Sequence, residues 1–462
     1  MSRILIAPWG NPFGWKKVKY ELKGKEYEAP TTLPLLMDKF KVDRVALIIL
    51  DSLAEVLPSF RYSDVKGEAE RRVRCFLAKN GIPSDRVDVI VSYSVGQLGR
   101  YQFDRELKDF YAHILWELGK RLLEASRRDE KIEIYLDLTH GINYIPTLVY
   151  RAVRKLGSIL AITKEAHLTV LNSETPKRNH PPDRPLKIHI VSKSRLQPLF
   201  LIRRIVPEPC DCDLKEPNEV PLLKDRQENE KEGLNCKHLI IYDALSSAVQ
   251  NGLPLLLLDL MNRTLEKSTT GKCAPSENGV VEYAWRAIEN CFKKYEENIT
   301  YFTEECKFYA KYSATSSLTN WIQVALLLSV LKDSLGPELR YDIHEGIRLD
   351  YLKKISERIW KRIIPTGIFV SESLRKDTKK IENCAESNSN NWRLYADCLK
   401  NKNNNEYNEC ASSPKDSRNF IAHSGITFGT VEIRMKNGKP HLRYRDGVIF
   451  KVAKDLSKHL PK

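Results

Sequence analysis

The segment SRNFIAHSG (417–425) brings together an arginine, an asparagine and a histidine, namely Arg418, Asn419 and His423. Such a set can cut RNA without a metal ion, because the ribose 2′-hydroxyl can attack its own neighbouring phosphate and leave a 2′,3′-cyclic phosphate. The planar donor fork of arginine matches phosphate oxygens and stabilises the charge of the phosphorane. A histidine, which titrates near neutral pH, can move protons. An asparagine amide can orient a hydroxyl or hold the histidine.

The local sequence predicts that these side chains lie on one short helix. Ser417 or Asp416 can cap the start of the helix, and Gly425 can end it. Arg418 would then lie in the first turn and His423 in the last. The alternative interpretation is a solvated helix that has no chemical role.

The first 205 residues alternate short apolar runs with amphipathic stretches. Runs rich in β-branched residues predict strands at 3–8, 44–50, 86–94, 131–138, 167–171 and 186–191. Apolar residues with helical periodicity predict helices at 68–81, 103–126 and 143–157. Strands and helices that alternate in this way predict the α/β class, with a Rossmann-like parallel sheet covered by helices on both faces.

Two loops of this domain hold residues suited to a nucleotide, since parallel sheets bind ligands beyond the carboxyl ends of their strands. After the first strand, Trp9 can stack on a base, while Gly10 and Asn11 let backbone donors approach. The loop after the fourth strand precedes a helix, whose N-terminus favours phosphate. The candidate contacts in this second loop are Thr139, His140, Gly141 and Asn143.

Each of these assignments has a structural alternative. Trp9 could be a core or interface aromatic residue, and His140 could bond within its own loop. The loop 94–101 is a third candidate, in which Arg100 could meet a phosphate. Neither of the two main loops has the G-x-G-x-x-G pattern of a dinucleotide-binding enzyme, and no P-loop motif occurs. Asp137 and His140 alone make a poor set of metal ligands, so no metal site is expected.

The remaining sequence predicts a linker and a helical domain. Residues 206–235 hold four prolines, 4 Lys or Arg and 9 Asp or Glu, which predicts an acidic linker or insertion. Residues 236–462 predict an all-α domain with one β-hairpin at 430–447, around Asn437-Gly438. The expected domains are therefore 1–205, 206–235 and 236–462.

Composition narrows the class of partner. The net charge is +15, and basic surfaces attract polyanions such as nucleic acid, although a basic surface without a partner is the plain alternative. None of the ten cysteines forms a C-x-x-C pair, which disfavours a zinc ribbon. No apolar run reaches the roughly 18–20 residues of a membrane span, and the first residues lack the long apolar region of a signal peptide. We therefore expect a cytoplasmic protein with no membrane partner.

A family resemblance joins these observations. RNFIAHSG (418–425) inside a helical domain resembles the catalytic motif of HEPN ribonucleases, and DLTHG (137–141) resembles the ligand loop of CARF domains. The order of the two domains is similar to that of the CARF–HEPN effectors of type III CRISPR systems, which act in antiviral defence. The resemblance covers nearly the whole chain by domain order, although its motifs are confined to these short stretches.

The resemblance implies a metal-independent endoribonuclease that cuts single-stranded RNA and needs no cofactor. It implies activation by a cyclic oligoadenylate bound in a CARF dimer, and we expect cyclic tetra-adenylate to be the allosteric activator. It also implies a homodimer or a higher homo-oligomer, in which Arg418 and His423 of two chains form one composite catalytic site, with Asn419 in support.

Two alternatives stay open at this point. The chain could be a non-catalytic regulator that binds nucleic acid through a winged helix, since the hairpin at 430–447 follows a helix. The N-terminal domain could also degrade its own activator.

Overall fold

The computed structural model describes residues 1–55, 61–175, 184–198, 203–206, 219–227, 231–262, 279–336, 344–363, 366–385, 391–400, 417–427, 429–445 and 447–457. The chain divides into two compact units, each built from several segments. Unit 1 contains Met1–Leu199, Leu223–Lys231 and Ile288–Leu326. Unit 2 contains Phe200–Leu222, Glu232–Ala287 and Leu327–Lys462.

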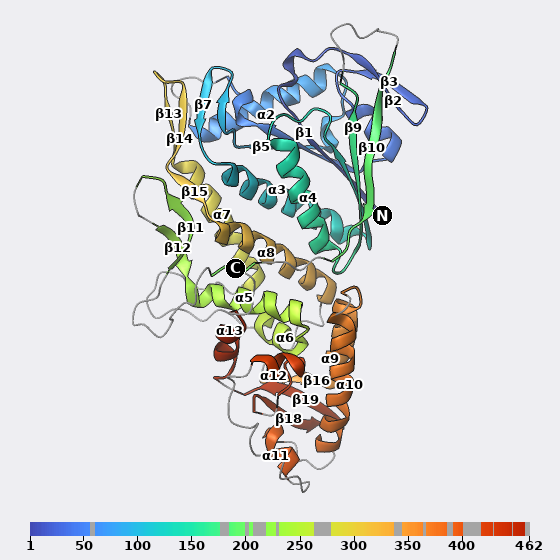
Figure 1. The fold of residues 1–462 in the computed structure, drawn as a ribbon, viewed down its shortest axis with the longest axis vertical. Helices are drawn as coiled ribbons and strands as arrows, with labels where there is room; N and C mark the ends of the chain where they lie inside the picture. The colour runs from blue at the N-terminus through green and yellow to red at the C-terminus, as the bar shows by residue number, and fades with distance from the viewer. Residues whose placement is uncertain are drawn as a thin grey trace. The chain divides into compact units, whose positions relative to one another are not determined.

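The main sheet of unit 1 has eight strands (Figure 1). They are β1 (Ser2–Pro8), β2 (Val18–Leu22), β3 (Lys25–Ala29), β4 (Arg44–Leu50), β5 (Val87–Ser92), β8 (Lys131–Asp137), β9 (Glu165–Ser173) and β10 (Leu186–Arg195). Their order is β3-β2-β10-β9-β8-β1-β4-β5, and the strands from β9 to β5 are parallel to one another. The predicted Rossmann-like parallel sheet is therefore confirmed.

One edge of this sheet carries an antiparallel hairpin that the sequence analysis did not predict. Strands β2 and β3 pair across Lys23 and Gly24, which both have positive φ angles, of 52° and 75°. Strand β10 runs antiparallel to β9 and parallel to β2, so it joins the hairpin to the sheet. The strands VKYEL and KEYEA are largely polar because they lie near or at an edge, and their sequence therefore lacks the apolar run of a central strand.

Four helices accompany the sheet: α1 (Leu33–Phe40), α2 (Tyr62–Lys79), α3 (Leu107–Arg128) and α4 (Ile145–Leu160). Figure 1 shows α2 on one side of the sheet and α3 and α4 on the other. Helices α3 and α4 pack against each other and against β1. Helix α4 buries Val149, Val153 and Leu156, which recur at the spacing of one helical face.

Unit 1 also takes in strands from distant parts of the chain. They are β6 (Gly96–Leu98), β7 (Tyr101–Asp104), β13 (Ile299–Phe302), β14 (Lys307–Ala310) and β15 (Tyr312–Ala314). Strand β11 (Glu219–Asp225) contributes residues to both units. Strand β14 pairs in parallel with β7, and the stacked rings of Phe103 and Phe308 lie 5.0 Å apart. Residues 288–326, which the sequence analysis assigned to the helical domain, therefore belong to unit 1, because β14 finds its partner there.

Unit 2 is largely helical. Its helices are α5 (Cys236–Asn251), α6 (Pro254–Asn262), α9 (Leu349–Trp360), α10 (Thr366–Ala385), α11 (Tyr395–Lys400), α12 (Ser417–Ala422) and α13 (Ile449–Ser457). Helices α7 (Val280–Glu297) and α8 (Ser316–Leu335) contribute residues to both units, and strand β12 spans Lys231–Asn235. Among the helices of the described residues, none combines the length and the apolar character that crossing a membrane requires.

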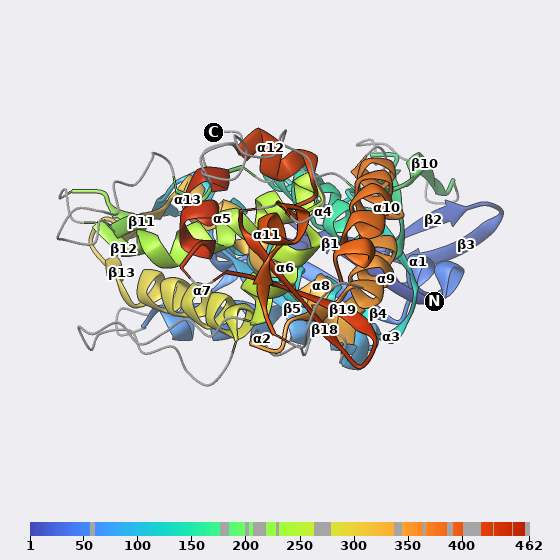
Figure 2. The same ribbon diagram turned by 90° about the horizontal axis from the view of Figure 1, so that it is seen from below.

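The predicted C-terminal hairpin is confirmed. Strands β18 (Val431–Lys436) and β19 (Lys439–Tyr444) pair across Asn437 and Gly438, whose φ angles of 51° and 69° are those of a type I′ turn. They form a four-stranded sheet with β16 (Ile347–Arg348) and β17 (Arg393–Leu394). Helices α9 and α10 pack against the hairpin (Figure 2).

Candidate functional site

The two predicted ligand loops meet at one edge of the unit 1 sheet. Strand β1 lies between β4 and β8, so the winding of the sheet reverses between β1 and β8. Ligands of open parallel sheets bind at such a switch point. The backbone N–H of Gly10 donates to the carbonyl oxygen of His140 at 2.8 Å, which fastens the loop after β1 to the loop after β8. The structure therefore brings both predicted loops to one place.

Close approach explains the glycines of these loops. A Cβ atom on Gly141 would lie 2.5 Å from Cγ of Pro146, and one on Gly10 would lie 2.7 Å from Cγ2 of Ile142. Asn143, which is exposed, has a φ angle of 50°, in the left-handed region that asparagine tolerates. The path of the second loop is thus set before helix α4 begins at Ile145.

Trp9 is not available for the base stacking that the sequence analysis predicted. Its side chain is 0% exposed, and its backbone N–H donates to the carbonyl oxygen of Ile48 at 2.8 Å, so the pairing of β1 with β4 continues through this residue. The indole packs edge-on against Trp15 and Phe76, with ring centroids 5.1 and 6.0 Å apart. This geometry gives Trp9 a packing role.

Trp15 is the tryptophan that reaches the edge of the site. It is half-buried and stacks on the His140 ring, with centroids 4.2 Å apart and an angle of 27° between the planes. Burial lowers the pKa of His140, and nearby Asp137 opposes this effect. The rings of Trp15 and His140 therefore form a stacked aromatic platform. Because its pKa is lowered, the His140 imidazole is neutral at pH 7. Trp15 was not among the predicted contacts, although a second tryptophan six residues after Trp9 was a visible signal.

Two of the predicted contacts shape the loops with their side chains. The Thr139 hydroxyl donates to Asp137 at 2.5 Å and accepts the backbone N–H of Ser173 at 3.0 Å. Oδ1 of Asn11 accepts the N–H of Phe13 at 3.0 Å, at the start of a short 3-10 helix. These side chains therefore help to hold the loop backbone.

The third candidate loop is tied to the second one. The N–H of Val95 donates to the hydroxyl of Tyr144 at 3.0 Å, directly before helix α4. Arg100 lies in the turn between β6 and β7, where it is exposed and donates to the Tyr101 hydroxyl at 2.6 Å.

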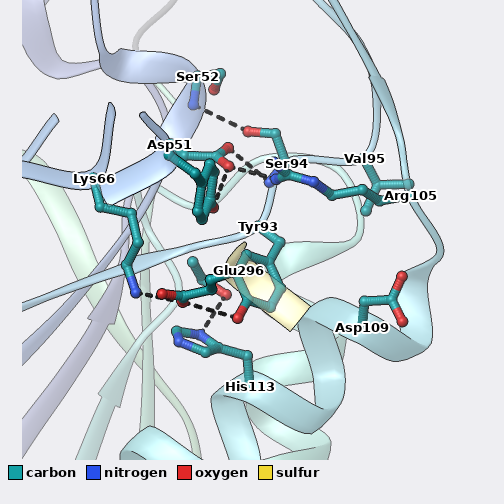
Figure 3. Close-up of polar contacts among 12 residues, drawn as sticks. Asp51, Ser52, Lys66, Tyr93, Ser94, Val95, Arg105, Asp109, His113 and Glu296 are labelled. Carbon is teal, nitrogen blue, oxygen red and sulfur yellow. Dashed lines mark hydrogen bonds and ion pairs between the residues drawn. The ribbon is translucent and has the colours of Figure 1, made fainter. Parts of the chain in front are cut away.

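A buried polar network lies where β4 and β5 end (Figure 3). Asp51 follows β4, and its carboxylate pairs with Arg105, both side chains being fully buried. The same carboxylate accepts the Tyr62 hydroxyl at 2.7 Å and the N–H of Ser94 at 2.9 Å. Asp51 therefore fixes the loop after β5 to the loop after β4.

Helix α7 enters this network through Glu296. Its carboxylate accepts the Tyr93 hydroxyl at 3.0 Å and pairs with Nζ of Lys66 at 2.7 Å. Below it, His113 on α3 bonds through Nδ1 to the Ser92 hydroxyl at 3.1 Å, and burial lowers the pKa of His113 to about 3 (Figure 3). No local pattern in the sequence joins residues so far apart, so this network was not predictable from the sequence.

The unit 2 motif forms a short helix with a sharp end. Helix α12 begins at Ser417, and two hydrogen bonds close it: Ser424 N–H to Ile421 oxygen at 3.0 Å and Gly425 N–H to Phe420 oxygen at 2.9 Å. Ser424 and Gly425 have φ angles of 50° and 82°. This pattern is a Schellman motif, in which His423 is the C-cap residue.

The imidazole of His423 faces helix α10. Its Nδ1 lies 3.4 Å from Oδ2 of Asp377, and the side chains of the histidine and the aspartate are 32% and 4% exposed. Arg418 and Asn419 lie on α12, but their side chains are outside the described residues. That the three predicted catalytic residues act together thus stays a prediction. Among the described residues, no group of three or more His, Cys, Asp or Glu is placed to hold a metal ion.

The comparisons with known proteins follow the same division of the chain. Residues 4–176 match the family model of the CARF domain of the CRISPR system endoribonuclease Csx1, and residues 369–446 match the model of its HEPN domain. The CRISPR system endoribonuclease Csx1 of Methanocaldococcus jannaschii is 39% identical over 180 residues, which are 38% of this chain and 37% of the relative's length. A solved structure of Enterococcus italicus Csm6 bound to cyclic hexa-2′-fluoro-hexa-dAMP aligns with 99% of this chain and 92% of its own, at 12% identity and a TM-score of 0.22.

A Rossmann-like CARF domain and a HEPN domain in one chain define a class of effector proteins. The two matched regions together span more than half of the sequence, and they contain the switch-point loops and His423, respectively. The chain belongs to the CARF–HEPN effectors of type III CRISPR systems. Within this family, it is similar to the Csx1 endoribonucleases.

Proposed function

We propose that the protein is a metal-independent endoribonuclease that cuts single-stranded RNA and is activated by a cyclic oligoadenylate. The observation that carries this proposal is the match of two separate regions of the chain to the CARF and HEPN domains of one kind of endoribonuclease. The partial exposure of His423 supports it, because an imidazole that substrate can reach could transfer a proton. Arg418 would stabilise the phosphorane, and Asn419 would support it.

The switch-point loops are the proposed activator site. The N–H groups of Gly10 and Gly141 donate within the loops, so other backbone N–H groups of the two loops would meet phosphates. The platform of Trp15 and His140 would receive an adenine. Stacking on an aromatic ring stabilises a bound base by about 1–3 kcal/mol. We propose cyclic tetra-adenylate as the ring, and a homodimer or higher homo-oligomer in which two chains complete each site. An activator works only if it binds the cutting arrangement more tightly than the resting one.

The proposal is tested by cleavage of an end-labelled single-stranded RNA in EDTA, with cyclic tri-, tetra- or hexa-adenylate or with none. We expect cutting with cyclic tetra-adenylate and products that end in 2′,3′-cyclic phosphate. His423→Ala should lower the rate about 10²–10⁴-fold, the usual contribution of general acid–base catalysis. His441→Ala is the matched control, since His441 lies on β19 within the same HEPN region.

Three results would count against parts of this proposal. Absence of cutting with every ring would exclude the activated ribonuclease. Cutting that is lost in EDTA and restored by magnesium would exclude the metal-independent mechanism. Equal losses in the His423 and His441 variants would remove His423 from the catalytic site.

The regulator alternative finds no support in the hairpin. A winged helix needs a hairpin that projects toward DNA. Here β18 and β19 are the central strands of a four-stranded sheet and are packed by α9 and α10. The hairpin is thus part of the packed structure of unit 2.

A further inference from the structure

Helix α10 buries a carboxylate directly against the candidate catalytic histidine. Buried positions on α10 are Val370, Ser373, Leu374, Asp377, Thr378 and Ile381, which recur at helical spacing along one face. Asp377 is thus the one acidic residue on the inward face of a helix whose other acidic residues point outward. An ionised carboxylate is costly to bury without a partner. Within the described residues, its hydrogen-bond partner is Nδ1 of His423 at 3.4 Å.

The backbone around His423 is held on two sides. The Ser373 hydroxyl, one turn before Asp377 on α10, donates to the carbonyl oxygen of Ala422 at 3.3 Å. The Tyr444 hydroxyl on β19 donates to the carbonyl oxygen of Gly425 at 2.8 Å. The Schellman turn thus sits between α10 and the hairpin, and the direction in which the imidazole leaves the backbone is set. What remains to be set is the rotation of the ring and its tautomer.

We propose that Asp377 is a positioning residue that sets the rotation and the tautomer of the His423 ring. Its carboxylate accepts the Nδ1–H of His423, so the neutral imidazole carries its proton on Nδ1 and presents the lone pair of Nε2 to the substrate. This inference rests on the proposed ribonuclease function and deepens it. It identifies Nε2 as the atom that moves the proton.

The chemistry balances with Nε2 in this role. The 2′-oxygen of RNA forms a bond to phosphorus while the bond from phosphorus to the 5′-oxygen breaks. One proton leaves the 2′-hydroxyl, and one arrives at the 5′-oxygen. Nε2 accepts the first or, once protonated, donates the second, and the Asp377 carboxylate stabilises the imidazolium while it exists. No oxidant, reductant or further reactant is consumed.

The test is Asp377→Asn in the full-length protein. The asparagine keeps the shape of the side chain, but its amide can donate to Nδ1 and so favour the wrong tautomer. We expect kcat to fall about 10²-fold while KM changes less than about twofold, because a general acid–base group acts on the chemical step. Glu372→Gln, an exposed charge loss on the same helix, is the matched control and should leave kcat unchanged.

A double variant separates positioning from a general structural role. If Asp377 acts through His423, then Asp377→Asn should cost nothing further when it is added to His423→Ala. An equal 10²-fold loss in both backgrounds, or a kcat of Asp377→Asn equal to that of the wild type, would overturn the proposal.

A second readout does not need RNA cleavage. In protein labelled with ¹⁵N in its histidine rings, the His423 signals are identified by their loss in His423→Ala. We expect the Nδ1–H tautomer in the wild type and a change of tautomer in Asp377→Asn. If the wild type cuts no RNA, the proposed function fails while this spectrum still decides the role of Asp377. An Nε2–H tautomer in the wild type, or identical signals in both proteins, would refute that role.

Discussion

We predict that the ion pair between Asp51 and Arg105 is important for the stability of unit 1. Both side chains are fully buried. Burial alone would lower the pKa of Arg105, but Asp51 and the buried tyrosines raise it above its ordinary value, so the guanidinium is charged. Nε and Nη2 of Arg105 have no hydrogen-bond partner among the described residues, and its Cζ lies 4.9 Å from the centre of the Tyr62 ring. Asp51 is thus the anion that balances this charge.

Asp51→Asn removes the negative charge and leaves the guanidinium in place. Breaking a buried pair from one side costs about 3–5 kcal/mol, because an uncompensated charge stays buried. For a unit of this size, the expected fall in Tm is roughly 10 °C. The measurement is calorimetry of the full chain, combined with hydrogen exchange of peptides from β4 and β5, which should lose protection first.

Two further variants test whether the buried, unpaired charge causes the fall in Tm. Glu68→Gln breaks the exposed pair with Arg71 on α2 and should hardly change Tm, since exposed pairs stabilise little. The double variant Asp51→Leu with Arg105→Met should recover part of the loss, because neither charge remains buried. If Asp51→Asn lowers Tm no more than Glu68→Gln does, the pair does not carry the stability assigned to it here.

Three other predictions concern the same unit. The pKa of His113, about 3 in the native state, lies below its unfolded value near 6.5, so the unfolded chain alone takes up this proton and stability falls as the pH drops below about 6.5. The free energy of unfolding should fall by about 2 kcal/mol between pH 7 and pH 5. Urea denaturation midpoints at the two pH values measure this loss, which should disappear in His113→Phe. Trp15→Ala should weaken cyclic tetra-adenylate binding by about tenfold or more in calorimetric titration, and unchanged affinity would remove the stacking platform. Gly141→Ala should weaken the same binding roughly tenfold through the clash with Pro146, while Gly14→Ala, whose Cβ meets open space, should not.

The elements that local sequence determines were predictable. The strand at 44–50 is a short apolar run rich in β-branched residues, and the structure gives it the same bounds. Asn437-Gly438 fixed the C-terminal hairpin, because both residues accept the positive φ angles of a type I′ turn. Gly425 likewise marked the end of α12.

Pairings between distant residues were not predictable from local pattern. Asp377 precedes His423 by 46 residues, and nothing in the polar sequence of α10 marks this aspartate as inward-facing. Trp9 follows directly on an apolar strand, yet the indole is buried by rings from elsewhere in the fold, those of Trp15 and Phe76. The sequence therefore indicated which segments carry chemistry, and the tertiary contacts decided which side chains of each segment face a ligand.

The interleaved order of the two units has a consequence for synthesis on the ribosome. When residue 199 has been made, β7 still lacks its partner β14, and the buried carboxylate of Asp109 still lacks the Ser313 hydroxyl and the Ala314 N–H that it accepts. Unit 1 is complete only after Leu326 has emerged. At about 5–20 residues per second, synthesis of residues 200–326 takes roughly 10 s, and during this time the edge of β7 is unpaired. An N-terminal fragment that stops near residue 205 would keep that edge open permanently, so early termination cannot yield a complete unit 1.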